Sequence, residues 1–139
     1  MIIRMSSGLY EELIRYCRSK LPEEACGFIQ GCSVEGGFNA TQFIPMTNNA
    51  LNPFEHFAMN PAEIVPILYK KEPQMIGIFH SHPSTEADLS QEDGFTEWHT
   101  LPTYWIFSFQ HPSAPVLQIF NIKKADQTRF NKLSFVIDQ

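Results

Sequence analysis

The apolar residues near the amino terminus follow a helical repeat. Leu9, Leu13 and Cys17 recur on one face of a segment that begins at Ser7. Basic residues gather toward the end of this segment, where they suit the helix dipole, and Pro22 cannot continue a helix. The pattern therefore predicts an amphipathic helix from Ser7 to about residue 20.

A second helix is predicted from position 61. Asn60 can cap it, Pro61 suits the first helical position, and Glu63 fits a capping box. This helix should run to about Lys71, where a Glu-Pro pair follows. A third helix is predicted to begin near Ser90.

Apolar or alternating runs of strand length fill most of the remaining chain. They are residues 25–31, 38–46, 55–60, 74–80, 104–110, 115–122 and 128–137. Gly36 and Gly37 mark a hairpin turn between the first two runs. Strands interspersed with helices predict a protein of the α/β (α+β) class.

Composition narrows the class of protein. A chain of 139 residues is expected to form one domain, residues 1–139, and its 12 Phe predict a core rich in phenylalanine. The net charge of −5 and the absence of a basic stripe argue against a nucleic-acid partner. No signal-peptide pattern and no apolar run near the roughly 20 residues of a spanning helix are present, which favours a cytoplasmic protein without a membrane partner.

The cysteines suggest neither disulfides nor a thiolate metal site. Cys17, Cys26 and Cys32 are odd in number and contain no C-x-x-C pair. We therefore expect reduced, mostly buried thiols.

The segment HSHPSTEADLSQED, residues 80–93, places metal-binding residue types at useful intervals. In an extended chain, residues two apart point to the same face, so His80 and His82 can reach one ion. A catalytic zinc needs three protein ligands and an open position, and Asp93 is the natural third candidate because the intervening loop can fold back. Asp93 with two imidazoles forms a set that suits zinc.

Two ordinary explanations compete with a metal site. Chance gives about 0.18 histidine pairs at this spacing in a sequence with five histidines, but only about 0.005 with an aspartate at the fixed later position. Ser90 and Asp93 also resemble a capping box, so Ser90 is a candidate for a helix cap, for a chemical role, or for both. The remaining histidines have no comparable neighbours, and we expect surface or structural roles for them: His56, His99 and His111.

The same segment resembles the signature of the JAMM (MPN+) metalloproteases, in which two histidines and an aspartate hold zinc and a serine assists. Their upstream glutamate, usually in an E-x-x-G setting, matches Glu24 in EACG, residues 24–27. Residues 47–64 look like the stretch before the second helix in small stand-alone bacterial members, so the resemblance covers nearly the whole chain. Leu89 stands where members commonly have proline, and the chain has no room for the insertions with which eukaryotic members grip ubiquitin chains.

The resemblance implies a fold and an activity. The fold would be a single MPN/JAMM-like domain, a curved, mixed and mostly antiparallel sheet flanked by about three helices, in a cytidine-deaminase-like architecture. One Zn²⁺ per chain would be held by His80, His82 and Asp93, with Glu24 as general base and Ser90 as donor to the oxyanion. The substrate would be a ubiquitin-like or sulfur-carrier protein, cut after its carboxy-terminal Gly-Gly, or a carrier-cysteine adduct. An extended tail of this kind can bind along a sheet edge.

Three alternatives use the same residues differently. The first is a non-catalytic scaffold module of the same fold, although such modules typically lack zinc ligands. The second is a two-metal phosphoesterase, which needs more ligands than the spare histidines provide, and the third is a zinc deaminase, whose P-C-x-x-C ligands are missing. The hairpin at residues 120–135 is a candidate for pairing with a second copy of the chain.

Overall fold

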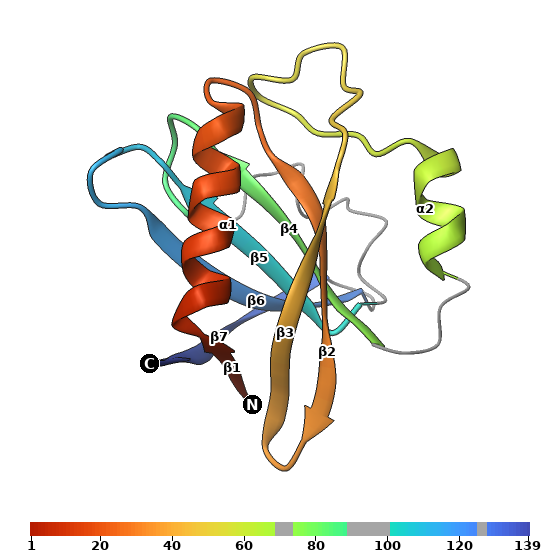
Figure 1. The fold of residues 1–139 in the computed structure, drawn as a ribbon, viewed down its shortest axis with the longest axis vertical. Helices are drawn as coiled ribbons and strands as arrows, with labels where there is room; N and C mark the ends of the chain where they lie inside the picture. Colours follow the sequence, from red (N-terminus) through yellow and green to blue (C-terminus); the bar gives the residue numbers. More distant parts are fainter. Residues whose placement is uncertain (69–73, 89–100, 125–127) are drawn as a thin grey trace.

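The computed structural model describes residues 1–68, 74–88, 101–124 and 128–139. In these ranges seven strands form one closed sheet, and one of two helices lies on either side of it (Figure 1). The helices are α1 (Ser7–Lys20) and α2 (Pro61–Leu68). The strands are β1 (Ile2–Ser6), β2 (Cys26–Val34), β3 (Gly37–Met46), β4 (Gln74–His82), β5 (Thr103–Ser108), β6 (Val116–Lys124) and β7 (Thr128–Asp138).

The sheet closes into a barrel in the order β1-β3-β2-β4-β5-β6-β7. Strand β1 closes it, because it pairs in parallel with β3 on one side and with β7 on the other. The pair β4·β5 is also parallel, and the other four pairs are antiparallel. The predicted mixed sheet is confirmed, whereas its mostly antiparallel character is not, since three of its seven strand pairs are parallel.

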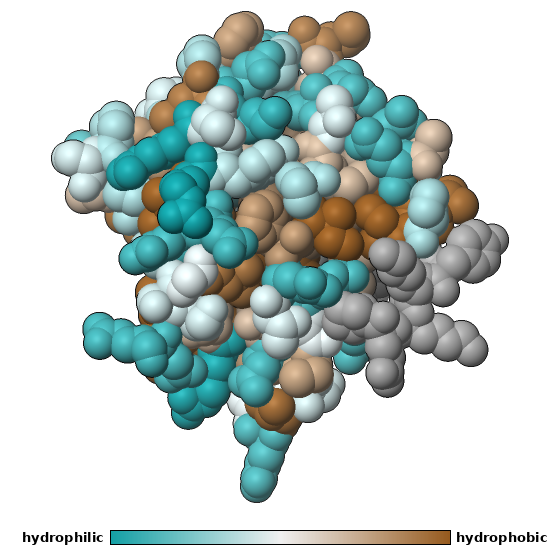
Figure 2. Space-filling model, viewed as in Figure 1, coloured by the Kyte–Doolittle hydropathy of each residue, from teal (hydrophilic) through white to brown (hydrophobic). Residues whose placement is uncertain are grey.

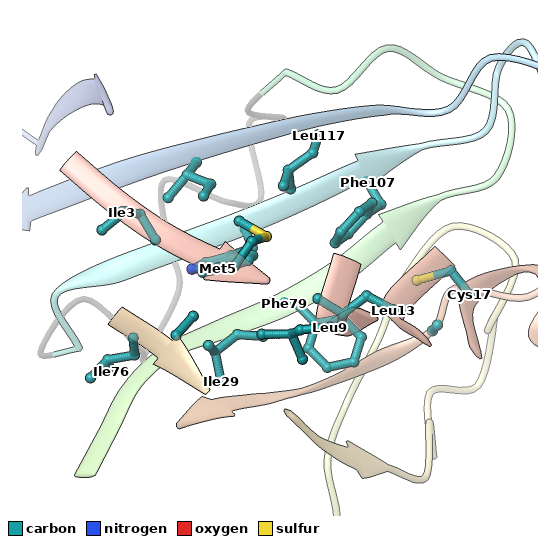
Figure 3. Packing of buried hydrophobic residues seen from close by; sticks show 14 of the residues in the cluster. Ile3, Met5, Leu9, Leu13, Cys17, Ile29, Ile76, Phe79, Phe107 and Leu117 are labelled. Carbon is teal, nitrogen blue, oxygen red and sulfur yellow. The ribbon is translucent and has the colours of Figure 1, made fainter. Parts of the chain in front are cut away.

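Two apolar layers pack against the two faces of the sheet. On one face, Leu9 and Leu13 of α1 belong to one buried cluster with Ile3, Phe79 and Phe107, and Figure 3 shows the two leucines beside Phe79. On the other face, Ile64 of α2 joins a second layer, whose fully or nearly fully buried members include Cys26, Phe28, Ile78, Tyr104, Ile106 and Phe120. Burial of a side chain of this size contributes about 1.5–3 kcal/mol, so both helices are held mainly by these contacts. The predicted phenylalanine-rich core is confirmed.

The predicted boundaries of the first helix agree with the structure. Ser6 caps α1 by accepting a hydrogen bond from the backbone N–H of Leu9 at 3.1 Å, and Leu21 ends it just before the proline. The hairpin turn is also confirmed, with Gly36 at a φ of 83° that favours glycine.

The second helix differs in detail from the prediction. Asn60 caps α2 through its side chain, which accepts from the N–H of Ala62 at 2.9 Å. The Glu63 carboxylate accepts instead from the backbone N–H and hydroxyl of Thr47, at 3.2 and 3.1 Å. The third helix predicted from Ser90 lies outside the described residues, as does the end of the second near Lys71.

The strand predicted over residues 55–60 is wrong. Only an isolated bridge between Asn48 and Met59 forms there. The reason is local, because the Asn48 side chain takes the carbonyl of His56 and the N–H of Ala58, groups that a neighbouring strand would otherwise pair. The chain therefore wraps around one side chain rather than extending.

The surface is mixed in character. Polar residues spread over the face in Figure 2, and apolar residues come to the surface in the middle of this face, between α1 and α2. Among the helices that the structure describes, none has the length and apolar character needed to cross a membrane.

Candidate metal centre

The end of β4 brings His80 and His82 to one face of the sheet. His80 lies between β2 and β5, and His82 pairs with β5 alone. The exposed fractions of the two histidines are 2% and 6%. Their ring centroids are 4.8 Å apart at an interplanar angle of 58°. Strand alternation therefore places the two imidazoles side by side, as their spacing in the sequence predicts.

Both imidazoles have an oxygen at the same ring nitrogen. His80 Nδ1 lies 3.1 Å from Glu24 Oε1, and His82 Nδ1 lies 2.8 Å from the backbone carbonyl of Glu86. Because a carboxylate and a carbonyl only accept, Nδ1 is the donor in each case, which assigns the tautomer from the partners. Histidines that bind metal through Nε2 usually donate Nδ1–H in this way. The pair thus fits two ligands of one ion.

The remaining predicted ligand cannot be placed. Asp93 and Ser90 lie outside the described residues. Within the described ranges no group of three His, Cys, Asp or Glu side chains converges as a metal site would require. Asp93 as third ligand and Ser90 as oxyanion donor therefore stay predictions.

Glu24 is a buried acid two residues before the start of β2. Its side chain is 6% exposed where it meets His80. The contact lies on the Nδ1 side of the ring, so the described geometry gives Glu24 the role of orienting His80.

Ser81 ties the two strands of the site together from the opposite face of β4. Its hydroxyl accepts from the N–H of Ala25 at 2.8 Å, and its own N–H donates to the carbonyl of Ala25 at 3.0 Å. Ala25 follows Glu24, so these bonds fix the backbone that carries the acid relative to the strand that carries the histidines. No local signal in the sequence indicates this role of Ser81, because its partner is 56 positions away.

Two aromatic rings pack against the His80 imidazole. Phe57 stacks on it at 4.6 Å and 23°, and Tyr104 meets it edge-on at 5.4 Å and 69°. These contacts fix the plane of the ring and keep water away from its faces. Phe57 comes from the segment mistaken for a strand, and no local signal in the sequence indicated its partner.

The thiols agree with the prediction of free, mostly buried cysteines. Cys17 and Cys26 are buried, and Cys32 is exposed. Burial, with a smaller effect of the nearby Glu24 carboxylate, raises the pKa of the Cys26 thiol to about 12. A neutral thiol is a poor nucleophile, and Cys26 lies buried in the same apolar cluster as Tyr104.

A cavity of about 240 Å³ opens near the end of β4, and neither His80 nor His82 is among the residues that line it. It is bounded by the loop after His82 and by β5, β6 and β7, and its polar lining includes Glu86, Asp88, Ser108, His111, Gln118 and Lys132. The Glu86 carbonyl bonds to His82, so one residue belongs to both the cavity and the support of the site. His111 therefore faces a cavity, whereas His99 lies outside the described residues.

The chain is similar to known proteins both in sequence and in fold. The profile of a family described as prokaryotic homologs of the JAB domain matches residues 6–123. Among solved structures, the solution structure of protein DSY2949 from Desulfitobacterium hafniense is similar to this chain, with a TM-score of 0.82 and 31% sequence identity over 99% of this chain and 93% of that one. No curated protein matches the sequence.

Proposed function

Because the chain belongs to the family of prokaryotic homologs of the JAB domain, we propose that it is a zinc metallopeptidase. The bond cleaved is a peptide or isopeptide bond after the carboxy-terminal Gly-Gly of a ubiquitin-like or sulfur-carrier protein, or the corresponding bond of a carrier-cysteine adduct. The observation that supports this proposal most directly is the histidine pair, in which each Nδ1 donates to an oxygen and Nε2 is the nitrogen suited to a metal.

The ligands assigned to the ion are His80, His82 and, by resemblance, Asp93. When bound, Zn²⁺ supplies a Lewis acid that polarises the scissile carbonyl and makes water acidic enough to attack near neutral pH. The two histidines hold the site rigidly, because their strand lies between two others and their rings are buried.

Glu24 has two tasks in this proposal. Oε1 accepts the Nδ1–H of His80 and so orients that ring. By resemblance, the same carboxylate is also assigned to take a proton from the attacking water and to deliver it to the leaving amine. The two tasks depend on different chemistry, since an amide oxygen can accept a hydrogen bond but cannot take up a proton at neutral pH.

Ser90 is assigned to the oxyanion by resemblance alone. A hydroxyl donor at that position contributes about 3–4 kcal/mol to stabilising the transition state in other hydrolases. Loss of this hydroxyl would slow turnover while the zinc ligands stay in place.

The substrate proposal depends on shape. Only Gly-Gly is narrow enough to pass closely by an enclosed metal, because any side chain would widen the tail. The cavity next to His82 supports this proposal, since it offers both acidic and basic side chains to a polar chain that approaches the site.

The experiment is incubation with candidate carrier fusions, with and without a chelator, read by intact mass. We expect cleavage directly after Gly-Gly, loss of cleavage with chelator and recovery when Zn²⁺ is added back. A zinc-loaded protein that leaves every carrier fusion intact would favour the non-catalytic scaffold instead.

A further inference from the structure

One side chain organises the loop of residues 48–58 beside the site. The Asn48 carboxamide makes several hydrogen bonds, all of them with backbone groups. Its Nδ2 donates to the carbonyls of Glu24 at 3.0 Å, His56 at 2.9 Å and, more weakly, Pro53 at 3.4 Å, and its Oδ1 accepts from the N–H groups of Ala50 at 3.0 Å and Ala58 at 3.1 Å. An amide has only two N–H donors, so the two shorter bonds, to Glu24 and His56, are the principal ones.

The loop holds Glu24 on both sides of its Cα atom. The carbonyl of Glu24 accepts from Asn48, and its N–H donates to the carbonyl of Pro53 at 2.7 Å. With both backbone groups bonded to the loop, only the side-chain torsions of Glu24 can vary. The loop therefore sets where the carboxylate meets His80.

The same loop also contacts the other partner of that hydrogen bond. Phe57 lies between two residues whose backbone groups bond to Asn48, His56 and Ala58, and its ring stacks on His80. Asn48 is thus connected to Glu24 through the backbone and to His80 through Phe57.

We propose that Asn48 is a positioning residue, which holds the Glu24 carboxylate and the His80 imidazole in register through the 48–58 loop. The inference rests on the proposed function, because the two positioned groups are the assigned base and a zinc ligand. A merely structural role would lower stability without changing the Glu24–His80 contact, so the two explanations can be separated.

The test compares Asn48→Asp with Asn52→Asp. The first change keeps both acceptor bonds but removes the donors to Glu24 and His56, and it places a carboxylate against their carbonyls. The second makes the same chemical change in the same loop at an exposed side chain that bonds only to Glu55 among the described contacts. Phe57→Leu serves as a second variant, which removes the ring stack on His80 and leaves Asn48 intact.

Two readouts are needed. In the metal-free protein, ¹⁵N-histidine NMR reports the exchange of the His80 Nδ1–H proton with water. In the zinc-loaded protein, kcat and KM on a carrier fusion report turnover. For Asn48→Asp and Phe57→Leu we expect the His80 Nδ1–H proton to exchange at least about tenfold faster than in the wild type. We also expect kcat to fall about 10- to 100-fold with KM little changed, which is the size of effect seen when the residues that support a metal site are lost. Asn52→Asp should match the wild type in both.

The outcomes separate this inference from the proposed function. One outcome is that the wild type cleaves no carrier fusion while the His80 Nδ1–H proton exchanges faster in Asn48→Asp and Phe57→Leu than in the wild type. In that case the positioning role stands and the peptidase proposal fails. If Asn48→Asp does not fold, Phe57→Leu decides. The inference would be overturned if Phe57→Leu, and Asn48→Asp if it folds, kept both the slow exchange of the His80 Nδ1–H proton and the wild-type kcat.

Discussion

The site is built from two regions of different kinds. The β4 region positions His80 and His82 by strand alternation, between two neighbouring strands. The 48–58 loop has no regular structure and relies on the side chain of Asn48 for much of its order. The strand carries the two proposed zinc ligands. The loop bonds to the backbone of Glu24 and packs the Phe57 ring on His80, so substitutions in the two regions should have different consequences. Damage to the strand should remove the metal, and damage to the loop should misalign a site that still binds it.

The largest effect is expected from the strand itself. His80→Ala removes one of two described candidate ligands, so zinc content should fall below one tenth of an ion per chain, roughly, and turnover should fall to background. Metal analysis of the purified protein measures the first and the carrier-fusion assay the second. The control is His111→Ala, which should keep its zinc because His111 is an exposed residue of the neighbouring cavity and is not an assigned ligand. Full zinc content in His80→Ala would remove His80 from the ligand set.

Two substitutions of Glu24 separate its tasks. Glu24→Gln keeps an oxygen that can accept from His80 Nδ1 but removes the base, so turnover should fall about 10²- to 10⁴-fold while zinc is retained. Glu24→Ala removes both the base and the acceptor for His80, so zinc affinity should also fall, by about 10- to 100-fold. Turnover of each variant and zinc competition with a chelator measure these effects. A Glu24→Gln protein with full turnover would exclude Glu24 as the base.

A smaller effect is expected from the bond between the strands. Ser81→Ala leaves the buried N–H of Ala25 without its hydroxyl acceptor, which should lower the free energy of unfolding by about 1–3 kcal/mol. Urea unfolding of the metal-free protein measures this change. Ser33→Ala provides a matched control at an exposed strand position, where the change should be within about 0.5 kcal/mol. Equal stability of the two variants would mean that the Ser81 hydroxyl does not hold Ala25.

The smallest effect concerns the thiols. Burial raises the pKa of both Cys17 and Cys26 to about 12, so at pH 8 nearly all of each is the unreactive thiol. In the native protein iodoacetamide should therefore modify only the exposed Cys32, one site per chain by intact mass, and leave zinc content unchanged. Rapid modification of Cys26 in the folded protein would show that the strand end at the site opens to solvent.

Much of the strand region could be predicted from the sequence, and much of the loop could not. Strand alternation and length are local properties, so β4 and its histidine pair were predicted to within a few residues. The short strand β1 and the closure of the barrel were missed, because five residues carry little pattern and closure depends on pairing with both β3 and β7. The role of Asn48 was missed for a similar reason, since its bond to Glu24 spans 24 positions.

A crystal structure of the zinc-loaded protein, with the ion located by its anomalous signal, tests the proposed metal centre most directly. We predict one ion per chain, bound through Nε2 of His80, Nε2 of His82 and the Asp93 carboxylate, with Glu24 close by but not bound to the metal. An ion bound through Nδ1 of His80, or an ion that does not contact the histidine pair, would contradict the account.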